Sequence, residues 1–166
     1  MSPAPKPPFR IEPYRPQDLP ALVCFMDALQ EHERALVPEL KPGPEIARSR
    51  SDYINRRVAE RNGVALLAKA DADSIGFASA WLDRDADPLL KEEEQGRGLV
   101  SDIYVVPEWR RRGVASALLA RLEEEMRAQG CRRMAICAKA ANVMAVECYE
   151  AAGYRAYEII LWKPIL

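Results

Sequence analysis

A basic turn with one glycine is the part of the sequence best suited to chemistry. The run WRRRGVASALL, residues 109–119, follows directly on the apolar segment LVSDIYVVP, residues 99–107. Gly113 removes a Cβ at the point where the phosphates of a ligand would meet the backbone. A helix that begins here offers unpaired N–H groups and the positive end of its dipole. Because three consecutive arginines at 110–112 add positive charge, the turn predicts a diphosphate site.

The spacing of the glycines excludes two common nucleotide-binding loops. A Walker A loop needs the pattern GxxxxGK[ST], which the chain lacks. A dinucleotide fingerprint needs GxGxxG at the start of a helix, and Gly96 and Gly98 are followed by Ser101 within an extended run. The pattern that remains is R-x-x-G-x-A, formed by Arg110, Gly113 and Ala115.

This pattern resembles motif A of the GNAT superfamily, the acetyl-CoA-dependent N-acetyltransferases. The family consensus is [QR]-x-x-G-x-[GA] after a strand that ends in V-x-P, and residues 105–107 read VVP. A later part of the chain is also similar to the family, because Asn142, Tyr149 and Gly153-Tyr154 mirror its N…Y…GF pattern, with tyrosine in place of phenylalanine. The resemblance covers residues 8–166 and implies one GNAT domain over that range.

The resemblance implies acetyl-CoA as cosubstrate and no metal. Backbone N–H groups of the basic turn would hold its pyrophosphate, and the preceding strand would pair with the pantetheine arm as an added strand does. The residues expected at the cofactor are Ile103, Tyr104, Val105, Arg110, Arg111, Arg112, Gly113, Val114, Ala115, Ser116, Asn142 and Tyr149. For an isolated glycine turn, an ordinary connection between a strand and a helix is the alternative.

Acetyl transfer from a thioester needs a proton donor for the departing thiolate. By its place in the second motif, Tyr149 is the candidate, and it lies seven residues after Asn142, so both side chains share a helix face. A phenol with a pKa of about 10 can protonate a thiolate of similar basicity. The alternative roles are packing against the sheet for Tyr149 and helix capping for Asn142.

The attacking amine must also lose a proton. Several subfamilies use a glutamate early in the fourth strand or one on the fifth, whereas this chain has Leu99 and Cys137 there. Asp102 lies inside the fourth expected strand and resembles the acidic residue that precedes [LIF]-[YF]-V in many small-molecule members. We expect Asp102 to act as the base or to anchor the amine. The alternatives are a salt bridge to a nearby arginine and a water chain to bulk solvent.

Further charged residues bear on the acceptor, which the resemblance implies to be a primary amine on a small molecule or peptide. His32 ends the first expected helix, where the dipole favours a histidine, and Glu31 and Glu33 beside it could line the acceptor site. One acidic connection is either a solvated loop or attracts a cationic acceptor. Its carboxylates are Asp83, Asp85, Asp87, Glu92, Glu93 and Glu94.

The elements that position these residues follow from the hydrophobic periodicity. Expected strands cover residues 9–15, 64–69, 74–82, 99–106, 133–138 and 153–163, and expected helices cover 16–33, 45–60, 114–129 and 142–152. A hairpin in the first half and a βαβα pattern in the second predict a mixed sheet. The fold class is therefore α/β: the GNAT fold, with six to seven strands flanked by four helices in three layers.

Composition sets the remaining limits. With 166 residues and a net charge of −1, the chain fits one domain after a disordered proline-rich tail at 1–7, without the basic excess of nucleic-acid binders. The N-terminus lacks the apolar core of a signal peptide, and no run reaches the roughly 18 apolar residues of a membrane span. The four cysteines form no C-x-x-C pair and are expected as buried reduced thiols of a cytoplasmic protein. Dimers are common in the family, so a homodimer is also expected.

Three functions are compatible with these residues. Direct attack of the amine on acetyl-CoA in a ternary complex is the leading hypothesis. Transfer through Cys148 or Cys137 normally needs a histidine base, and the candidate His32 is far away in the sequence. A non-catalytic module that binds acyl-CoA or a protein partner would fit the missing glutamates.

Overall fold

Five strands and four α-helices make up the part of the chain that the structure describes. This computed structural model describes residues 9–84 and 88–165. Along the chain come β1 (Arg10–Pro13), α1 (Leu19–Leu36), α2 (Gly43–Glu60), β2 (Val64–Ala70), β3 (Asp73–Asp83), β4 (Arg97–Val105), α3 (Val114–Ala128), β5 (Met134–Ile136) and α4 (Val143–Ala151). None of the helices in these residues is long and apolar enough to cross a membrane. The expected tail at 1–7 lies outside the described residues.

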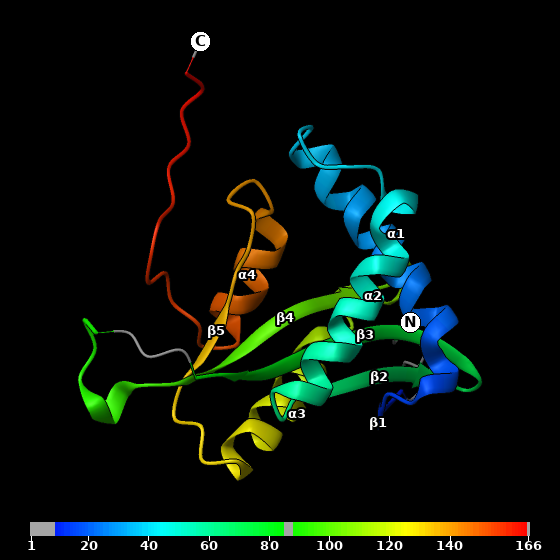
Figure 1. Ribbon diagram of the computed structural model, residues 1–166. Helices are drawn as coiled ribbons and strands as arrows, with labels where there is room; N and C mark the ends of the chain where they lie inside the picture. The colour runs from blue at the N-terminus through cyan, green and yellow to red at the C-terminus, as the bar shows by residue number, and fades with distance from the viewer. Residues whose placement is uncertain (1–8, 85–87, 166) are drawn as a thin grey trace, which may run out of the picture.

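The strands form one mixed sheet in chain order, β1-β2-β3-β4-β5 (Figure 1). The first three pairings are antiparallel, and β4 and β5 are parallel. A parallel pair needs a long crossover, and α3 supplies it. The hairpin followed by βαβ that the sequence predicted is therefore present.

Side chains that alternate along the strands feed two separate cores. On one face of the sheet, Ala78 and Val105 pack with Leu118 of α3. On the other face, their neighbours Phe77 and Tyr104 pack with α1 and α2. Successive strand residues point to opposite faces, so each of these strands needs cover on both sides. The result is the expected three-layer arrangement, with α3 on one side and α1 and α2 on the other.

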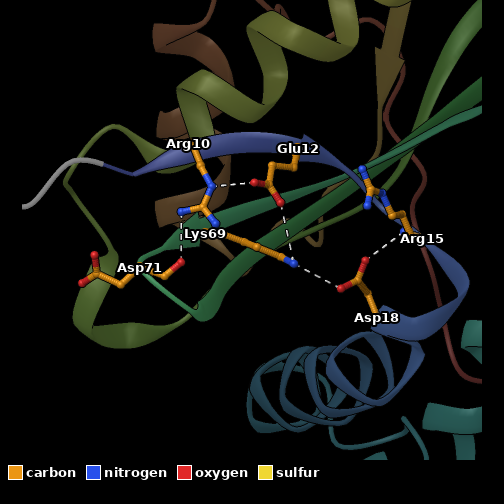
Figure 2. Close-up of polar contacts among 6 residues, drawn as sticks. All are labelled: Arg10, Glu12, Arg15, Asp18, Lys69 and Asp71. Carbon is orange, nitrogen blue, oxygen red and sulfur yellow. Dashed lines mark hydrogen bonds and ion pairs between the residues drawn. The ribbon is translucent and has the colours of Figure 1, made fainter.

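A cluster of charged groups fastens the entry of α1 onto β2. Lys69 Nζ lies 3.2 Å from Asp18 Oδ1 and 3.7 Å from Glu12 Oε2, and Figure 2 shows the ammonium between the two carboxylates. Asp18 also accepts a hydrogen bond from the backbone N–H of Arg15 at 2.9 Å. Because the side chains of Lys69 and Asp18 are largely buried, solvent and salt screen this pair less than a surface pair. The cluster sets the point at which α1 leaves the sheet.

One extra residue in β4 shapes the far end of the sheet. Asp102 pairs with Ser79 of β3, but Val100 pairs with Ala80, so Ser101 is unmatched. Such a bulge bends a strand and increases its twist. β5 pairs only with residues of β4 that precede the bulge. Beyond it the two strands diverge, as Figure 1 shows.

The expected closing strand is the main correction to the fold. All four expected helices and the first five expected strands are present, with ends shifted by a few residues. None of residues 153–163 is in a strand, so the described sheet has five strands and not six to seven. A strand exists through hydrogen bonds to a neighbour, and residues 155–165 make no backbone hydrogen bond to another described residue. The prediction of a strand at residues 153–163, made from its apolar composition, was therefore wrong.

The cysteines are free thiols, but they are not buried as expected. Cys24 and Cys137 are exposed, and Cys131 and Cys148 are partly exposed. Leu22 is one of the buried residues of α1, whereas Cys24, two residues later, falls on the solvent-facing side of the helix. The expectation of buried thiols was therefore wrong.

Replacement of one core ring tests the double-sided packing of the sheet. Phe77 is 0% exposed and meets Tyr14 edge-on at 5.9 Å between ring centroids. We expect Phe77→Ala to lower the free energy of unfolding by about 3–5 kcal/mol, because a cavity opens in the α1–α2 core. Urea denaturation measures the loss. The control Leu89→Ala changes a side chain that is 91% exposed and should stay within about 0.5 kcal/mol; equal losses for the two variants would contradict the packing described.

Candidate active site

An open cleft of about 2080 Å³ lies where β4 and β5 diverge. α1, α2, the end of β4, the start of α3, and α4 with the residues after it form its walls. The candidate site residues that line it are Asp102, Ile103, Tyr104, Val105, Arg110, Arg111, Gly113, Val114, Ala115, Ser116, Asn142 and Tyr149, whereas Arg112 does not. The fold thus brings the two sequence motifs to the same cleft.

The turn before α3 has the backbone form of an anion site. Arg111 and Gly113 both have positive φ angles, +57° and +82°. This region is uncommon for arginine, and strain of this kind gathers at functional sites. Turns of this type point successive N–H groups into one concavity. A Cβ on Gly113 would meet no described atom within 4 Å, so its φ angle and not a crowded neighbour requires glycine.

The three arginines of the turn have different surroundings. Arg110 Nε donates to the Val105 carbonyl at 3.0 Å and so ties the turn to the end of β4. The guanidinium of Arg112 lies 5.3 Å from the centroid of the Trp109 ring, within the range of a cation–π contact. Arg111 lines the cleft and has no ion-pair partner among the described residues. Of the three, Arg111 is the one placed to meet an anion in the cleft.

The start of α3 adds backbone donors to the turn. Val114 is the first residue of this helix, directly after Gly113. The first N–H groups of a helix have no intrahelical acceptor, and they carry the positive end of the dipole. Ala117 N donates to the Gly113 carbonyl at 3.0 Å, so the helical bonds begin only there. The N–H groups of Val114, Ala115 and Ser116 remain for a ligand.

The open edge of β4 extends the site away from the turn. Residues 103–105 pair with β3 on one side, while β5 reaches only as far as Val100 on the other. Backbone groups of a strand alternate between its two edges, so those facing away from β3 are open to an added strand. Backbone N–H groups that can bind an anion lie next to an open strand edge. This combination fits a cofactor that carries phosphates on an extended, amide-bearing arm.

Asp102 forms an ion pair with an arginine of α2. Arg50 Nε lies 3.1 Å from Asp102 Oδ1, and Arg50 Nη2 lies 2.9 Å from Oδ2. The bulge also brings the Ser101 hydroxyl to the same carboxylate, to which it donates. The side chain of Asp102 is only 6% exposed, so its charge needs this partner. The salt bridge considered as an alternative is therefore present, and sequence analysis missed Arg50 because nothing links residues 50 and 102 before the chain folds.

Glu33 is a second carboxylate on the cleft wall. It lies near the end of α1 and is half-buried. Burial raises the pKa of Glu33 above its ordinary value, while the charges of Lys139 and Asp102 act on it in opposite directions. A carboxyl with a raised pKa is better matched to proton transfer near neutral pH than an ordinary one. Sequence analysis placed Glu33 beside the acceptor site but had no signal for its burial.

Tyr149 lies against the core and faces the cleft. Its ring packs against the apolar cluster on the α3 side, 6.4 Å from the ring of Tyr154. Burial raises the pKa of Tyr149, and Cys148, Glu33 and Asp102 raise it further. The phenol therefore keeps its proton at neutral pH, as a proton donor must.

Asn142 is the N-cap of α4. Its Oδ1 accepts a hydrogen bond from the N–H of Ala145 at 3.2 Å, while the residue also lines the cleft. The capping role expected of an asparagine here is present, and it leaves the side-chain amide N–H groups for a ligand.

The cysteines offer little support for a covalent route. Burial raises the pKa of the Cys148 thiol, which disfavours the nucleophilic thiolate. His32 lines the cleft, but no hydrogen bond joins it to a thiol within the described residues. Those residues also contain no group of three or more His, Cys, Asp or Glu side chains that could hold a metal ion.

The described acidic side chains of the connection between β3 and β4 do not line the cleft. Asp85 and Asp87 are outside the described residues. Asp83 forms an ion pair with an arginine of β4 at 3.1 Å. Glu93 and Glu94 border a second, smaller hollow of about 340 Å³ and do not line the large cleft. The described part of the connection favours a solvated loop.

The buried ion pair can be tested by its stability. We expect Asp102→Asn to lower the free energy of unfolding by about 1–2 kcal/mol, because Arg50 loses its charge partner but is 37% exposed and partly solvated. Urea denaturation gives the difference. In the matched control, Arg48→Met removes an exposed pair with Asp52 and should cost less than about 0.5 kcal/mol. If Asp102→Asn left the free energy of unfolding unchanged, a structural role for the pair would be contradicted.

Comparison with known proteins gives a consistent result. The sequence matches the profile described as Acetyltransferase (GNAT) family over residues 26–154. An aminoglycoside N(6′)-acetyltransferase type 1 from Stenotrophomonas maltophilia is 30% identical over 112 residues, 67% of this chain and 72% of that protein. A protein of the same name from Salmonella enteritidis is 27% identical over 139 residues, 80% of this chain and 89% of that protein.

Solved structures share the fold. Aminoglycoside N-acetyltransferase AAC(6′)-Iy in complex with CoA has a TM-score of 0.71 at 22% identity, covering 98% of this chain and 97% of that chain. A predicted acetyltransferase from Clostridium acetobutylicum, solved with acetyl-CoA, has a TM-score of 0.74 at 18% identity, covering 95% and 96%. At these identities the structural likeness shows the fold alone.

Proposed function

This chain belongs to the acetyltransferase (GNAT) family, and we propose that it moves the acetyl group of acetyl-CoA to a primary amine by direct attack in a ternary complex. The observation that carries the proposal is the strained turn at Arg111 and Gly113, which opens into the cleft beside the free edge of β4. The catalytic domain is proposed to span residues 8–166, because β1 is part of the sheet although the family profile begins later.

The chain's own groups would hold the cofactor in an extended form. The N–H groups of Val114, Ala115 and Ser116, with the turn at Gly113, meet the pyrophosphate, and Arg111 adds positive charge. Arg110 keeps the turn in place through its bond to β4, and Arg112 sits over an indole ring at the rim. The remaining contacts on the arm come from the backbone of Ile103, Tyr104 and Val105 and the amide of Asn142.

Tyr149 is proposed as the proton donor. Bound acetyl-CoA supplies a thioester carbonyl for attack and a thiolate as leaving group. Tyr149 Oη, protonated at neutral pH, gives its proton to the departing sulfur. The burial that raises the phenol pKa also raises the basicity of a thiolate formed in the same surroundings, so the two remain matched.

The two carboxylates of the cleft have different proposed roles toward the acceptor amine. Glu33 accepts the amine proton, because its pKa is raised and no cation pairs with it directly among the described residues. Asp102 is committed to Arg50 and Ser101, but its Oδ1 has a second lone pair with which it can anchor an ammonium or amine N–H. Asp102 is thus proposed as the anchor and Glu33 as the base.

The acceptor is proposed to be a small cationic amine of the aminoglycoside class. Two relatives carry that substrate class in their names. The acceptor side of the cleft carries the negative charge of Glu33, which favours a cationic substrate, while the charge of Asp102 is balanced by Arg50. Use of acetyl-CoA supports a cytoplasmic location. A homodimer is proposed from the likeness to the family alone.

Tyr149→Phe tests the reaction. We expect wild-type protein to turn over acetyl-CoA with an amine, and the variant to lose about 100-fold or more in kcat, because the proton donor is gone. Calorimetry with CoA should give a Kd within about twofold of wild type, since the ring and its packing stay.

Tyr154→Phe is the matched control, because it removes a neighbouring buried hydroxyl from the same motif. Its kcat should equal that of wild type. A wild-type protein that binds CoA but turns over no amine in a panel of aminoglycosides and polyamines would instead support the non-catalytic module, and failure to bind CoA would overturn both functions.

The pH profile tests Glu33. A base acts in its ionised form, so kcat/KM falls as the pH falls through its folded-state pKa. Because the pKa of Glu33 is raised, this acidic limb should lie above 4.5, the ordinary value. Glu33→Gln should remove the limb and lower kcat/KM by about 100-fold. The exposed control Glu45→Gln should keep the wild-type profile; a limb that persists in Glu33→Gln would assign it to another group.

A further inference from the structure

Lys139 is the one lysine within residues 9–84 and 88–165 that lines the cleft. It is exposed and lies in the connection between β5 and α4. The other lysines in these ranges do not line the cleft: Lys41, Lys69, Lys91 and Lys163. A lysine side chain carries a primary amine, which is the functional group proposed for the acceptor. The chain therefore has an amine of its own at the wall of the candidate active site.

The backbone of Lys139 is fixed beside residues with a proposed role at the cofactor. The Lys139 carbonyl accepts a hydrogen bond from Asn142 N at 2.8 Å, and Asn142 caps α4 through the N–H of Ala145. Tyr149, the proposed proton donor, lies on the same helix two turns after the cap. The Lys139 side chain thus starts from a held position at the end of α4 where Asn142 would meet the cofactor arm. Its flexible four-carbon stem lets the ammonium reach into the cleft.

The Lys139 ammonium lies near the proposed base. It has no hydrogen-bond or ion-pair partner among the described residues. Of the charged groups that act on the pKa of Glu33, Lys139 has the largest effect, ahead of Asp102 and Arg50. The interaction of two charges weakens with distance, so this effect places the ammonium close to the Glu33 carboxyl. Figure 1 shows the end of α1, which carries Glu33, and the connection before α4 on the same side of the molecule.

Lysine differs in its chemistry from the arginines that line the same cleft. The guanidinium groups of Arg50 and Arg111 stay protonated in a protein, so their nitrogens do not act as nucleophiles. An ammonium can lose a proton to a neighbouring base, and its nitrogen then carries a nucleophilic lone pair. Among the described cations of the cleft, Lys139 is therefore the side chain that combines a nucleophilic amine with a nearby carboxyl of raised pKa.

We propose that Lys139 is an internal acceptor: when no free amine occupies the cleft, the chain acetylates its own Lys139 side chain from bound acetyl-CoA. This inference rests on the proposed function, because it uses the same acetyl donor, base and proton donor. Attachment to the chain holds the amine beside the reacting groups, and such proximity replaces a second binding event.

The reaction balances without a further reactant. The Lys139 ammonium gives one proton to Glu33, and its neutral nitrogen attacks the thioester carbonyl carbon. The N–C bond forms and the C–S bond breaks, while Tyr149 protonates the departing thiolate. The nitrogen releases its second proton to water, Glu33 returns its proton to solvent, and Tyr149 takes a new one from solvent. Each event converts one acetyl-CoA and one lysine ammonium to CoA, acetyl-lysine and one proton.

Acetylation changes the charge of the cleft and ends the reaction. The positive charge of Lys139 is lost, and with it the lowering effect that this charge has on the pKa of Glu33. A cationic acceptor then meets one like charge fewer in the cleft. The nitrogen of acetyl-lysine is an amide and no longer a nucleophile, so each chain reacts once.

Peptide mass spectrometry tests the site in wild-type protein incubated with acetyl-CoA and no amine. We expect Lys139 to gain an acetyl group at least about tenfold faster than Lys41 and Lys91, which are exposed lysines outside the cleft. The rate at Lys139 should saturate with acetyl-CoA and stay constant across protein concentrations, whereas the rate at Lys41 should rise linearly with acetyl-CoA. Equal rates at the three lysines, a lack of saturation, or a rate that grows with protein concentration would overturn the proposal.

Lys139→Arg provides a second test, because it keeps the positive charge but removes the amine. Without an acceptor, we expect wild-type protein to release about one CoA per chain and then stop, and Lys139→Arg to release none. The control Lys41→Arg should release the same amount as wild type, since Lys41 does not line the cleft. Circular dichroism should show that both variants are folded. A release of CoA that persists in Lys139→Arg would contradict an internal acceptor at this position.

An assay with a free amine, run in parallel, separates two kinds of failure. Wild-type protein that acetylates an aminoglycoside or polyamine but leaves Lys139 unmodified would overturn this inference and leave the proposed function intact. Wild-type protein that neither binds CoA nor acetylates any amine, Lys139 included, would overturn both.

Discussion

The divergence of β4 from β5 is the constraint on which the rest of the site depends. One unmatched residue, Ser101, bends β4, and β5 follows it no further than Val100. Backbone polar groups left without a strand partner are costly unless water or a ligand satisfies them. The sheet thereby keeps a polar edge inside an otherwise apolar fold. At the same bulge, the Asp102 carboxylate accepts hydrogen bonds from Ser101 and from the guanidinium of Arg50. The pair with Arg50 ties α2 to the widened end of the sheet.

Charge is unevenly distributed along the cleft, and this orients its ligands. Backbone donors at the start of α3, with Arg111, favour anionic groups at one end. Glu33 and Asp102 line the same cleft, with Asp102 paired to Arg50, and both carboxylates raise the pKa of Tyr149. In the proposed function, the phosphates of the cofactor meet the donors of the turn, and the acceptor amine meets Glu33 and Asp102.

The second half of the domain is less complete than the first. β2, β3 and most of β4 are covered on both faces, whereas β5 and α4 bury no residue fully. The apolar C-terminal segment, residues 155–165, stands free and does not cover this half. Read from composition alone, residues 153–163 were expected to close the sheet. The segment is apolar as the sequence indicated, but an apolar pattern does not specify whether a segment finds a neighbouring strand to pair with.

Local patterns in the sequence determined the helices, five of the strands and the position of the basic turn, because periodicity, glycine and proline act over a few residues. The motifs around Gly113 and Tyr149 were sufficient to indicate the family. Only the tertiary structure decided that Arg50 neutralises Asp102, that Glu33 is half-buried, and that Cys24 and the closing segment are exposed. These properties depend on which groups approach across long stretches of chain. Burial and ion pairing are set by such neighbours, and no local pattern records them.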